Sequence, residues 1–292
     1  MKMIRRLLAL TLLILAPAAG MSAGQNPAPA QPEVKPVYEV YAISYGVLPD
    51  FPVSQLVAGA DKSRKMDIQM MFWLLKGPGG RNILVDCGFH REKFFKDWKV
   101  KDYIKPSDAL KKLGLKPSDI TDVIITHMHW DHADGLDLFP TAKVWIQKDE
   151  YDYYINDPDT PGKNRSGVDP EDVAVVAATK NHHKQLKIVD GDNKELIRGV
   201  VFYTGGRHTY ASQYVGVNTK AGTVVVASDN LYLYENLDKH APIAATFDAA
   251  SNLKAQERMK QIASNPRFIV PGHDPDVFVR FPKPGNGIAK IE

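Results

Sequence analysis

Residues 122–139 read DVIITHMHWDHADGLDLF, an apolar run followed by a dense polar cluster. The pattern predicts a short buried strand over residues 122–126, a loop over 127–132 and the start of a helix over 133–139. Polar side chains at the carboxyl end of a strand lie where open sheets expose their sites. We therefore expect the strand to position the loop, and the loop to carry the chemistry.

The loop has the pattern H-x-H-x-D-H, formed by His127, His129, Asp131 and His132. Neutral imidazoles and carboxylates are the ligands that zinc prefers in proteins. Because these side chains cannot all reach one ion, we expect His127 and His129 to face one metal and Asp131 and His132 to face another. The alternative, a set of hydrogen-bonded loop histidines without metal, explains this dense pattern less well.

Two metals need further ligands, and three residues elsewhere in the chain suit this role. His208, Asp229 and His273 each follow an expected strand. They therefore lie, like the loop, at strand carboxyl ends. From the residues alone we predict that these three side chains complete the metal site.

The remaining pattern indicates an α+β domain. Strands are expected over residues 37–44, 68–76, 82–86, 143–147, 186–189, 199–204, 213–219, 223–228 and 267–270. Helices are expected over residues 106–113, 148–155, 173–178 and 246–264. Each half of the chain runs strands first and then a helix, which predicts two packed sheets with helices outside.

Five short motifs give the chain a resemblance to a known family. They are Leu84-Val85-Asp86-Cys87-Gly88, Thr126-His127-Met128-His129-Trp130-Asp131-His132, Gly206-Arg207-His208-Thr209, Ser228-Asp229-Asn230 with Tyr232, and Pro271-Gly272-His273-Asp274. With these motifs the chain resembles the metallo-β-lactamase-fold hydrolases and, within them, the N-acyl homoserine lactonases. The likeness extends over nearly all of residues 38–280.

The resemblance implies a four-layer αβ/βα sandwich of two mixed sheets with outer helices. It also implies two zinc ions per chain, with other divalent transition metals as alternatives. The implied ligands are His127, His129 and His208 for the first zinc, Asp131, His132 and His273 for the second, and Asp229 as a bridge. Tyr232 is implied to point at the substrate.

The implied activity is opening of the lactone ring of N-acyl homoserine lactones, and thus quorum quenching, by a hydroxide that the two metals share. The Tyr232 hydroxyl would stabilise the oxygen that becomes anionic, and Asp131 or Asp229 would move the proton. The alternatives are a zinc β-lactamase, and a phosphotriesterase or thioesterase, on the same fold. A non-catalytic zinc-binding module is disfavoured because all seven ligand positions carry competent side chains.

Some residues depart from the family pattern or have ordinary interpretations. Arg207 and Asp134 stand where the family often has glycine. Both are expected to alter the pocket, and neither is expected to change a metal ligand. Cys87 is expected to be a small buried residue rather than a zinc ligand. His90 and His240 are expected at the surface or at helix caps. The pair at 182–183 is expected to be solvated.

Several larger side chains are expected in the core rather than in the pocket. They are the aromatic residues Phe139, Trp145, Tyr151, Tyr153 and Tyr154, and the run Met70-Met71-Phe72-Trp73.

Length and composition exclude several classes of protein. The chain has 292 residues, of which 44% are hydrophobic and 24% charged, as in an ordinary globular enzyme. The formal net charge is +3, and it vanishes without Lys2, Arg5 and Arg6. The rest of the chain then has no excess of basic residues of the kind that binds nucleic acid. Cys87 is the single cysteine, so the chain forms no intramolecular disulfide.

The first residues are typical of a secretory leader. Three basic side chains precede the apolar run at 7–16, which is about half the length that a membrane span needs. We expect a signal peptide over residues 1–23, a Pro/Ala-rich tether over 24–36, and the hydrolase domain over 37–292. The mature protein is expected in the periplasm or outside the cell, free of the membrane, with a small lactone or ester as its partner.

Overall fold

A computed structural model describes residues 34–157, 162–181 and 185–291. The expected leader and all but the last residues of the expected tether lie outside the described residues. From Lys35 onward the described chain belongs to one folded unit.

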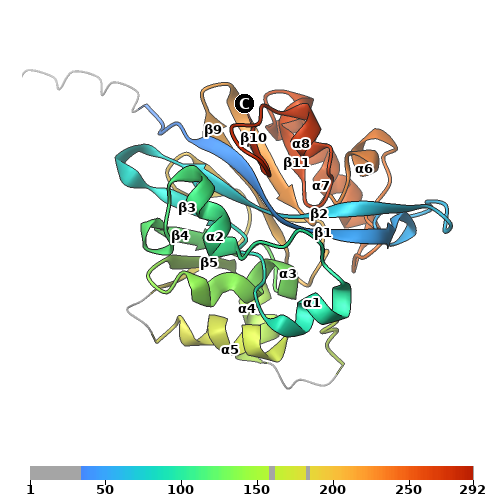
Figure 1. Cartoon of the computed structure of the whole chain (residues 1–292), viewed down its shortest axis with the longest axis horizontal. Helices are drawn as coiled ribbons and strands as arrows, with labels where there is room; N and C mark the ends of the chain where they lie inside the picture. The colour runs from blue at the N-terminus through green and yellow to red at the C-terminus, as the bar shows by residue number, and fades with distance from the viewer. Residues whose placement is uncertain (1–33, 158–161, 182–184, 292) are drawn as a thin grey trace, which may run out of the picture. The chain divides into compact units, whose positions relative to one another are not determined.

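The first sheet is mixed and has seven strands (Figure 1). In spatial order they are β12 (Ile288–Ile291), β1 (Glu39–Pro52), β2 (Lys65–Lys76), β3 (Asn82–Val85), β4 (Asp122–Ile124), β5 (Lys143–Gln147) and β6 (Leu186–Val189). Pairing is antiparallel from β12 to β3 and parallel from β3 to β6. Because β3 and β4 run in parallel, the segments that follow them leave the sheet at the same edge.

The second sheet is also mixed and has five strands. In spatial order they are β11 (Ile269–Pro271), β10 (Gly222–Ser228), β9 (Gln213–Thr219), β8 (Val200–Thr204) and β7 (Lys194–Ile197). Only β10 and β11 are parallel to each other. Their carboxyl ends therefore lie together at one edge of this sheet.

Three apolar cores separate four layers. Along β1 the side chains alternate: Ile43 and Tyr45 enter the core on the outer face of the first sheet, and Val40 and Ala42 enter the core between the two sheets. A third core joins the second sheet to Met259 and its helix. This alternation follows from the two-residue period of a strand buried on both faces.

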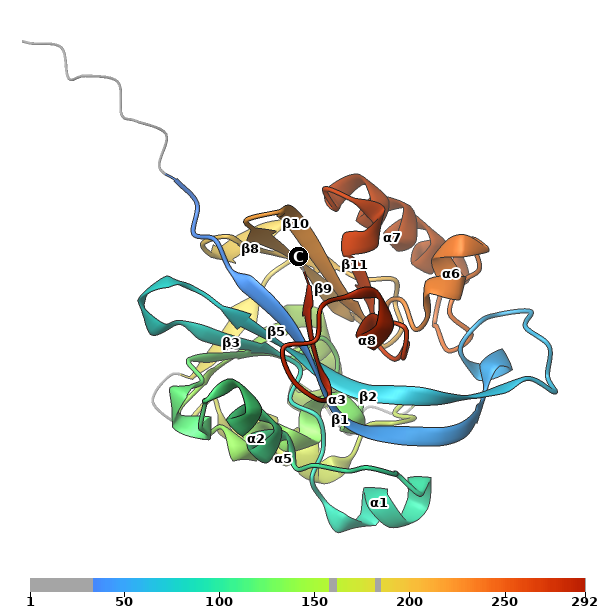
Figure 2. The ribbon, with the colours of Figure 1, turned by 45° about the horizontal axis from the view of Figure 1, so that its top comes forward.

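Helices cover both outer faces (Figures 1 and 2). Those that contribute to the core outside the first sheet are α1 (Glu92–Trp98), α2 (Pro106–Ala109), α3 (Trp130–Ala133), α4 (Lys148–Tyr151) and α5 (Pro170–Ala178). On the side of the second sheet lie α6 (Tyr234–Asp238), α7 (Ala249–Ile262) and α8 (Val277–Arg280). The predicted fold class, two mixed sheets with helices outside, is confirmed.

Some elements differ from the sequence-based expectation. Strand β1 continues eight residues beyond Ser44, and its pairing with β2 shifts register twice, between Ser44 and Gly46 and between Leu48 and Phe51. The expected single helix over 106–113 is α2 followed by a 3-10 turn that ends at Gly114, where φ is +72°. Strands β7 and β12 and helices α1, α6 and α8 were not predicted.

Within the described residues no helix combines the length and the apolar character that crossing a bilayer requires.

Candidate metal centre

The loop after β4 and three segments of the second sheet converge on one point. His127 follows β4 closely, and α3 begins at Trp130 inside the motif. Of the other side chains that converge here, one follows β8, one follows β10 and one follows β11. The structure thus brings together all seven predicted ligands, in two groups: His127, His129, His208 and Asp229, and Asp131, His132, His273 and Asp229.

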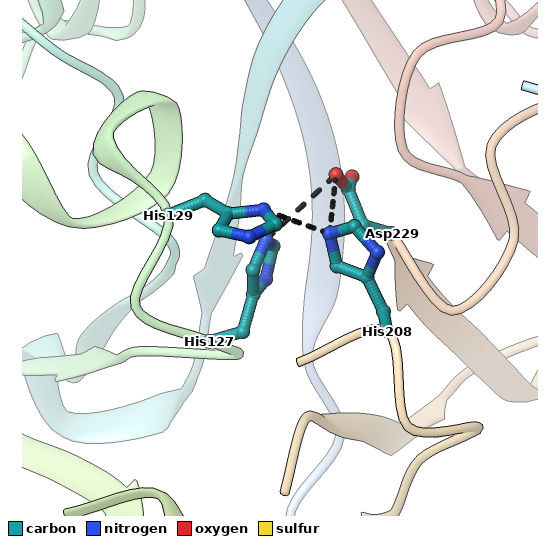
Figure 3. A group of neighbouring side chains, drawn as sticks. All are labelled: His127, His129, His208 and Asp229. Carbon is teal, nitrogen blue, oxygen red and sulfur yellow. Dashed lines mark hydrogen bonds and ion pairs between the residues drawn. The ribbon is translucent and has the colours of Figure 1, made fainter. Parts of the chain in front are cut away.

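The first group is shown in Figure 3. His208 Nε2 lies 2.9 Å from His129 Nδ1 and 3.4 Å from Asp229 Oδ2. His127 Nε2 lies 3.7 Å from the same carboxylate oxygen. Three ring nitrogens and one oxygen therefore surround a common point.

The second group shares the Asp229 carboxylate with the first. His132 Nε2 lies 3.3 Å from Asp131 Oδ2 and 3.3 Å from Asp229 Oδ2. His273 Nε2 lies 3.1 Å from Asp229 Oδ1 and 3.6 Å from Asp131 Oδ2. Asp229 is thus placed between the two groups, where a bridging ligand would have to lie.

The donor atoms fit two small cations. Ligands at about 2.0–2.1 Å around a tetrahedral zinc stand roughly 3.3 Å from one another, and the separations above scatter around this value. In addition, His127 Nε2 and His132 Nε2 are buried and make no hydrogen bond with the described residues. Buried polar atoms are normally paired, so these two nitrogens point to a ligand such as a metal ion.

Most of the site histidines are held by a hydrogen bond at the ring nitrogen that faces away from the centre. His132 Nδ1 lies 2.9 Å from Asp86 Oδ2, and His127 Nδ1 lies 2.9 Å from Thr126 Oγ1. His208 Nδ1 lies 2.8 Å from the Ala245 carbonyl oxygen, and His273 Nδ1 lies 3.0 Å from the carbonyl oxygen of Gln69 on β2. Such contacts fix ring orientation and tautomer in metal sites.

At the first group and at the shared Asp229, electrostatics favour the protonation states that metal binding needs. Burial lowers the pKa of His127 well below its usual value and lowers the pKa of His129 to about 3, so both rings are neutral at pH 7. Burial opposes ionisation of Asp229, but the neighbouring His132 and His273 overcome this and hold its pKa well below the ordinary value. The first two rings are therefore neutral and the shared carboxylate charged.

A cavity of 420 Å³ opens onto the site. His129, Asp131, Asp229 and His273 line its inner end. The rest of the lining is largely apolar: Leu48, Phe51, Leu56, Ile68, Met70, Trp98, Trp130, Ala244 and Ala245. Met70 was expected only in the core, but it is buried and also reaches this wall.

Tyr232 is buried beside the metal groups and lines the same cavity. Its hydroxyl oxygen lies 3.4 Å from His208 Nδ1. Burial, with the nearby Asp229, raises the pKa of Tyr232 well above its usual value, so the phenol keeps its proton. It can therefore donate a hydrogen bond to a molecule in the cavity.

Asp134 and Arg207 lie outside the cavity lining, although they were expected to alter the pocket. Asp134 is buried and accepts hydrogen bonds from the Arg91 guanidinium and from the His90 backbone N–H. Arg207 has a positive φ of +56°, and its guanidinium lies 5.3 Å from the Tyr210 ring centroid. Both act on loop structure rather than on the pocket wall.

The other expectations concern residues around the site. Cys87 is fully buried, burial raises the pKa of its thiol, and its Sγ lies 3.1 Å from the His132 carbonyl oxygen. His240 is exposed and pairs with Glu257, and His90 pairs with Asp137. The pair at 182–183 lies outside the described residues.

The expected core aromatics are buried, apart from the half-buried Tyr153. Tyr154 also lines a second cavity beside His129.

Sequence reasoning missed the residues that support the ligands. Asp86 was noted only as part of a motif, yet it accepts hydrogen bonds from Thr126 and Ser228 as well as facing His132. The signal that could have identified it is its place in the sequence, directly after the apolar run that forms β3. Glu150 on α4 also supports the ligand-bearing loops, because its carboxylate accepts hydrogen bonds from the Met128 and Ala211 N–H groups. Its place in the sequence carried no such signal.

Comparison with known proteins agrees with this geometry. Residues 71–273 match the family model described as the metallo-beta-lactamase superfamily. An N-acyl homoserine lactonase of Bacillus cereus is 29% identical over 214 residues, which cover 66% of this chain and 76% of that protein. The N-acyl homoserine lactonase AttM of Rhizobium radiobacter is 24% identical, covering 74% of this chain and 86% of that protein.

Solved structures share the fold. The Bacillus thuringiensis lactonase AiiA, solved as a mutant with N-decanoyl-L-homoserine at its active site, aligns with a TM-score of 0.67 and 23% identity. The alignment covers 84% of this chain and 97% of that chain. AidC, a dizinc quorum-quenching lactonase, aligns with a TM-score of 0.61 and 16% identity over 88% of this chain and 97% of that chain. The expected resemblance to lactonases of this fold, and the expectation of a metal-dependent hydrolase, are confirmed.

Proposed function

Since this chain belongs to the metallo-beta-lactamase superfamily, we propose that it is a dinuclear zinc hydrolase that opens the lactone ring of N-acyl homoserine lactones. The observation that carries the proposal is the cavity, because its apolar wall leads directly to the two ligand groups. An acyl chain suits the wall, and a lactone carbonyl suits the polar end. The curated relatives above, named as lactonases of such substrates, support the same choice.

Zinc is the metal proposed because each group offers imidazole nitrogens and carboxylate oxygens, the donors that zinc favours. When bound, a pair of such ions supplies an acidified water and polarises a carbonyl group. The residues that would hold the first ion are His127, His129 and His208. Those for the second are Asp131, His132 and His273, and Asp229 would serve both.

The chain's own residues supply orientation and proton transfer. The Tyr232 hydroxyl, protonated and facing the cavity, would donate to the oxygen that gains negative charge when the ring is attacked. Asp229 faces His127, His132 and His208, which leaves it little freedom to move. Asp131 contacts only the second group and lines the cavity. We therefore assign Asp131, an ionised carboxylate, the transfer of the proton from the newly formed carboxylic acid to the leaving alkoxide.

The test is ring opening of N-decanoyl homoserine lactone by the zinc-loaded protein, followed as acid release. A chelator should abolish turnover and zinc should restore it. His129→Ala and Asp229→Ala should each lower kcat/KM at least about 100-fold, whereas the exposed His240→Ala should leave it unchanged. Folded, zinc-loaded protein that leaves the lactone intact but hydrolyses a cephalosporin, a thioester or a phosphotriester would contradict the substrate assignment.

We also propose that the protein is exported to the periplasm or beyond. The support is the sequence alone: Lys2, Arg5 and Arg6 precede the apolar run at 7–16, and small residues follow. Expression in a Gram-negative host should give a mature protein that lacks about the first 23 residues and is released by osmotic shock. Full-length protein retained in the cytosol would contradict export.

A further inference from the structure

His129 is held differently from the other site histidines. Its Nδ1 faces His208, so the opposite edge of the ring points away from the centre. That edge packs against Gly167: a Cβ built on this glycine would lie 2.7 Å from His129 Cδ2 and 3.0 Å from Nε2. Real Cβ atoms do not approach so closely. The glycine backbone is therefore the surface on which this ring rests.

The backbone around Gly167 is tied to the same loop. The Trp130 N–H donates to the Gly167 carbonyl oxygen at 2.9 Å, which fixes the glycine next to the residue that follows His129. Gly167 has a φ of +78°, a conformation that L side chains rarely adopt. Both its conformation and its contact with the ring therefore require glycine.

Lys163 anchors the start of this segment. Its Nζ donates to the Tyr153 carbonyl oxygen at 3.0 Å and to the Asp157 carbonyl oxygen at 2.8 Å. The Asn164 N–H donates to the Tyr153 hydroxyl at 2.9 Å. These bonds attach residues 163–168 to the helical turn that contains Tyr153.

The same tyrosine contacts the loop that carries a second ligand. Its ring stacks on Tyr210 with a centroid separation of 4.0 Å and an interplanar angle of 12°. Tyr210 is only two residues after His208 and belongs to the same loop. Gly167 thus contacts His129, and Tyr153 contacts the loop that carries His208, so these two ligands of the first group are reached from this part of the chain.

We propose that Tyr153 and residues 163–168 form a clamp that positions the first metal group and not the second. Gly167 acts on His129 by packing, and Tyr153 acts on the His208 loop through Tyr210. In the second group, His132 and His273 take their orientation from Asp86 and Gln69 instead. The clamp is a set of positioning residues, and the inference rests on the metal centre of the proposed function.

The test uses two glycines that differ in one respect. Gly162 has a similar φ of +84°, but a Cβ there would meet no atom within 4 Å. Gly162→Ala and Gly167→Ala therefore share the backbone strain, and only Gly167→Ala pushes on His129. Co²⁺ titration of the metal-free protein, followed by visible absorption, should show two tight sites in the wild type and in Gly162→Ala. Gly167→Ala should keep one tight site and bind the other about 10- to 100-fold more weakly.

The spectrum of the remaining tight site identifies which group is lost. In Gly167→Ala it should match that of His129→Ala and differ from that of His132→Ala. Two unchanged affinities in folded Gly167→Ala, or weakening of both sites, would overturn the clamp. A wild-type protein that binds no Co²⁺ would instead overturn the metal centre itself, so the two failures are distinguishable.

A second variant decides the question if Gly167→Ala does not fold. Lys163→Met removes the anchor from the clamp without adding bulk near the ligands, and should weaken the first site selectively. Lys148→Met is the matched control, because Lys148 forms an exposed pair with Asp152 on the neighbouring helical turn. Equal Co²⁺ affinities in Lys163→Met and Lys148→Met would overturn the proposal.

Discussion

The ligands of this site depend on neighbours that do not themselves face the metals. Asp86 is the fullest example, because its two carboxylate oxygens serve the Thr126 backbone and hydroxyl, the Ser228 hydroxyl and the His132 ring. All of these groups are buried. Removing the carboxylate would leave several buried donors unpaired at once.

Asp86→Ala should therefore weaken metal binding about 10- to 100-fold and lower the free energy of unfolding of the metal-free protein by at least about 2 kcal/mol. Metal titration and urea denaturation measure the two effects. The exposed Asp97→Ala on α1 is the control. If Asp86→Ala bound metal as tightly as that control, the supporting role would be wrong.

Tyr232 is predicted to act on the rate rather than on the metals. Tyr232→Phe keeps the ring but removes the donor, so kcat for lactone opening should fall about 100-fold with metal content unchanged. Tyr234→Phe, a change to a buried tyrosine that lines a different cavity, should have little effect. Unaltered kcat in Tyr232→Phe would remove the hydroxyl from the mechanism.

The seven ligand candidates could be predicted because the chemistry of metal binding restricts residue types, and each candidate stands in a short recognisable motif. The residues that hold these ligands in place could not be predicted in this way. The Glu150 carboxylate, the Gln69 carbonyl and the Gly167 backbone act through contacts between segments far apart in sequence. Nothing local at these positions distinguishes them from ordinary helix, strand or loop residues.

Among the elements, short strands between turn residues were the most predictable. Strands β5, β6 and β9 have the predicted bounds, because each is a short apolar or alternating run between turn residues. Strand β12 was missed because its four residues become a strand only by pairing with β1, some 250 positions away. The short helices α1, α6 and α8 lack a full amphipathic period, so tertiary packing rather than propensity forms them.

Helix α4 connects the two ligand-bearing loops through Glu150. Its carboxylate accepts hydrogen bonds from the Met128 N–H at 3.0 Å, the Thr209 hydroxyl at 2.7 Å and the Ala211 N–H at 2.7 Å. Burial raises the pKa of Glu150 to about 7. The folded state therefore holds this proton more tightly than the unfolded state does.

It follows that Glu150 contributes most to stability at low pH and that this contribution is lost as pH rises towards about 7. In Glu150→Gln this dependence is absent. The wild type's advantage in unfolding free energy over Glu150→Gln should shrink between pH 5 and pH 8 by on the order of 2 to 3 kcal/mol. Urea denaturation of the metal-free proteins at each pH measures it. A difference that is constant with pH would refute the assignment.

At the scale of the whole molecule, the site joins the two sheets. Four ligands come from the loop after β4 of the first sheet, and three come from the second sheet. The backbone of Gln69 on β2 also exchanges hydrogen bonds with His273, since its N–H donates to the His273 carbonyl oxygen at 2.9 Å. Metal binding should therefore stabilise the packing of one sheet on the other.

Chelation should lower the melting temperature, because ligands that bind only the folded state add to its stability. With free zinc at about a thousand times its dissociation constant, the gain is about 4 kcal/mol, or on the order of 10 °C in a chain of this size. Calorimetry with and without chelator measures it. His240→Ala should keep the full shift and Asp229→Ala should lose most of it. Identical melting temperatures with and without zinc would exclude a structural contribution.

The division of the ligands between the sheets also bears on how the protein acquires its ions. During synthesis, residues 127–132 emerge long before His273, so the growing polypeptide offers only an incomplete set of donors. Full affinity arises when the chain is finished and its halves have assembled. Which ion occupies the site therefore depends on the metals present in the compartment where that assembly takes place.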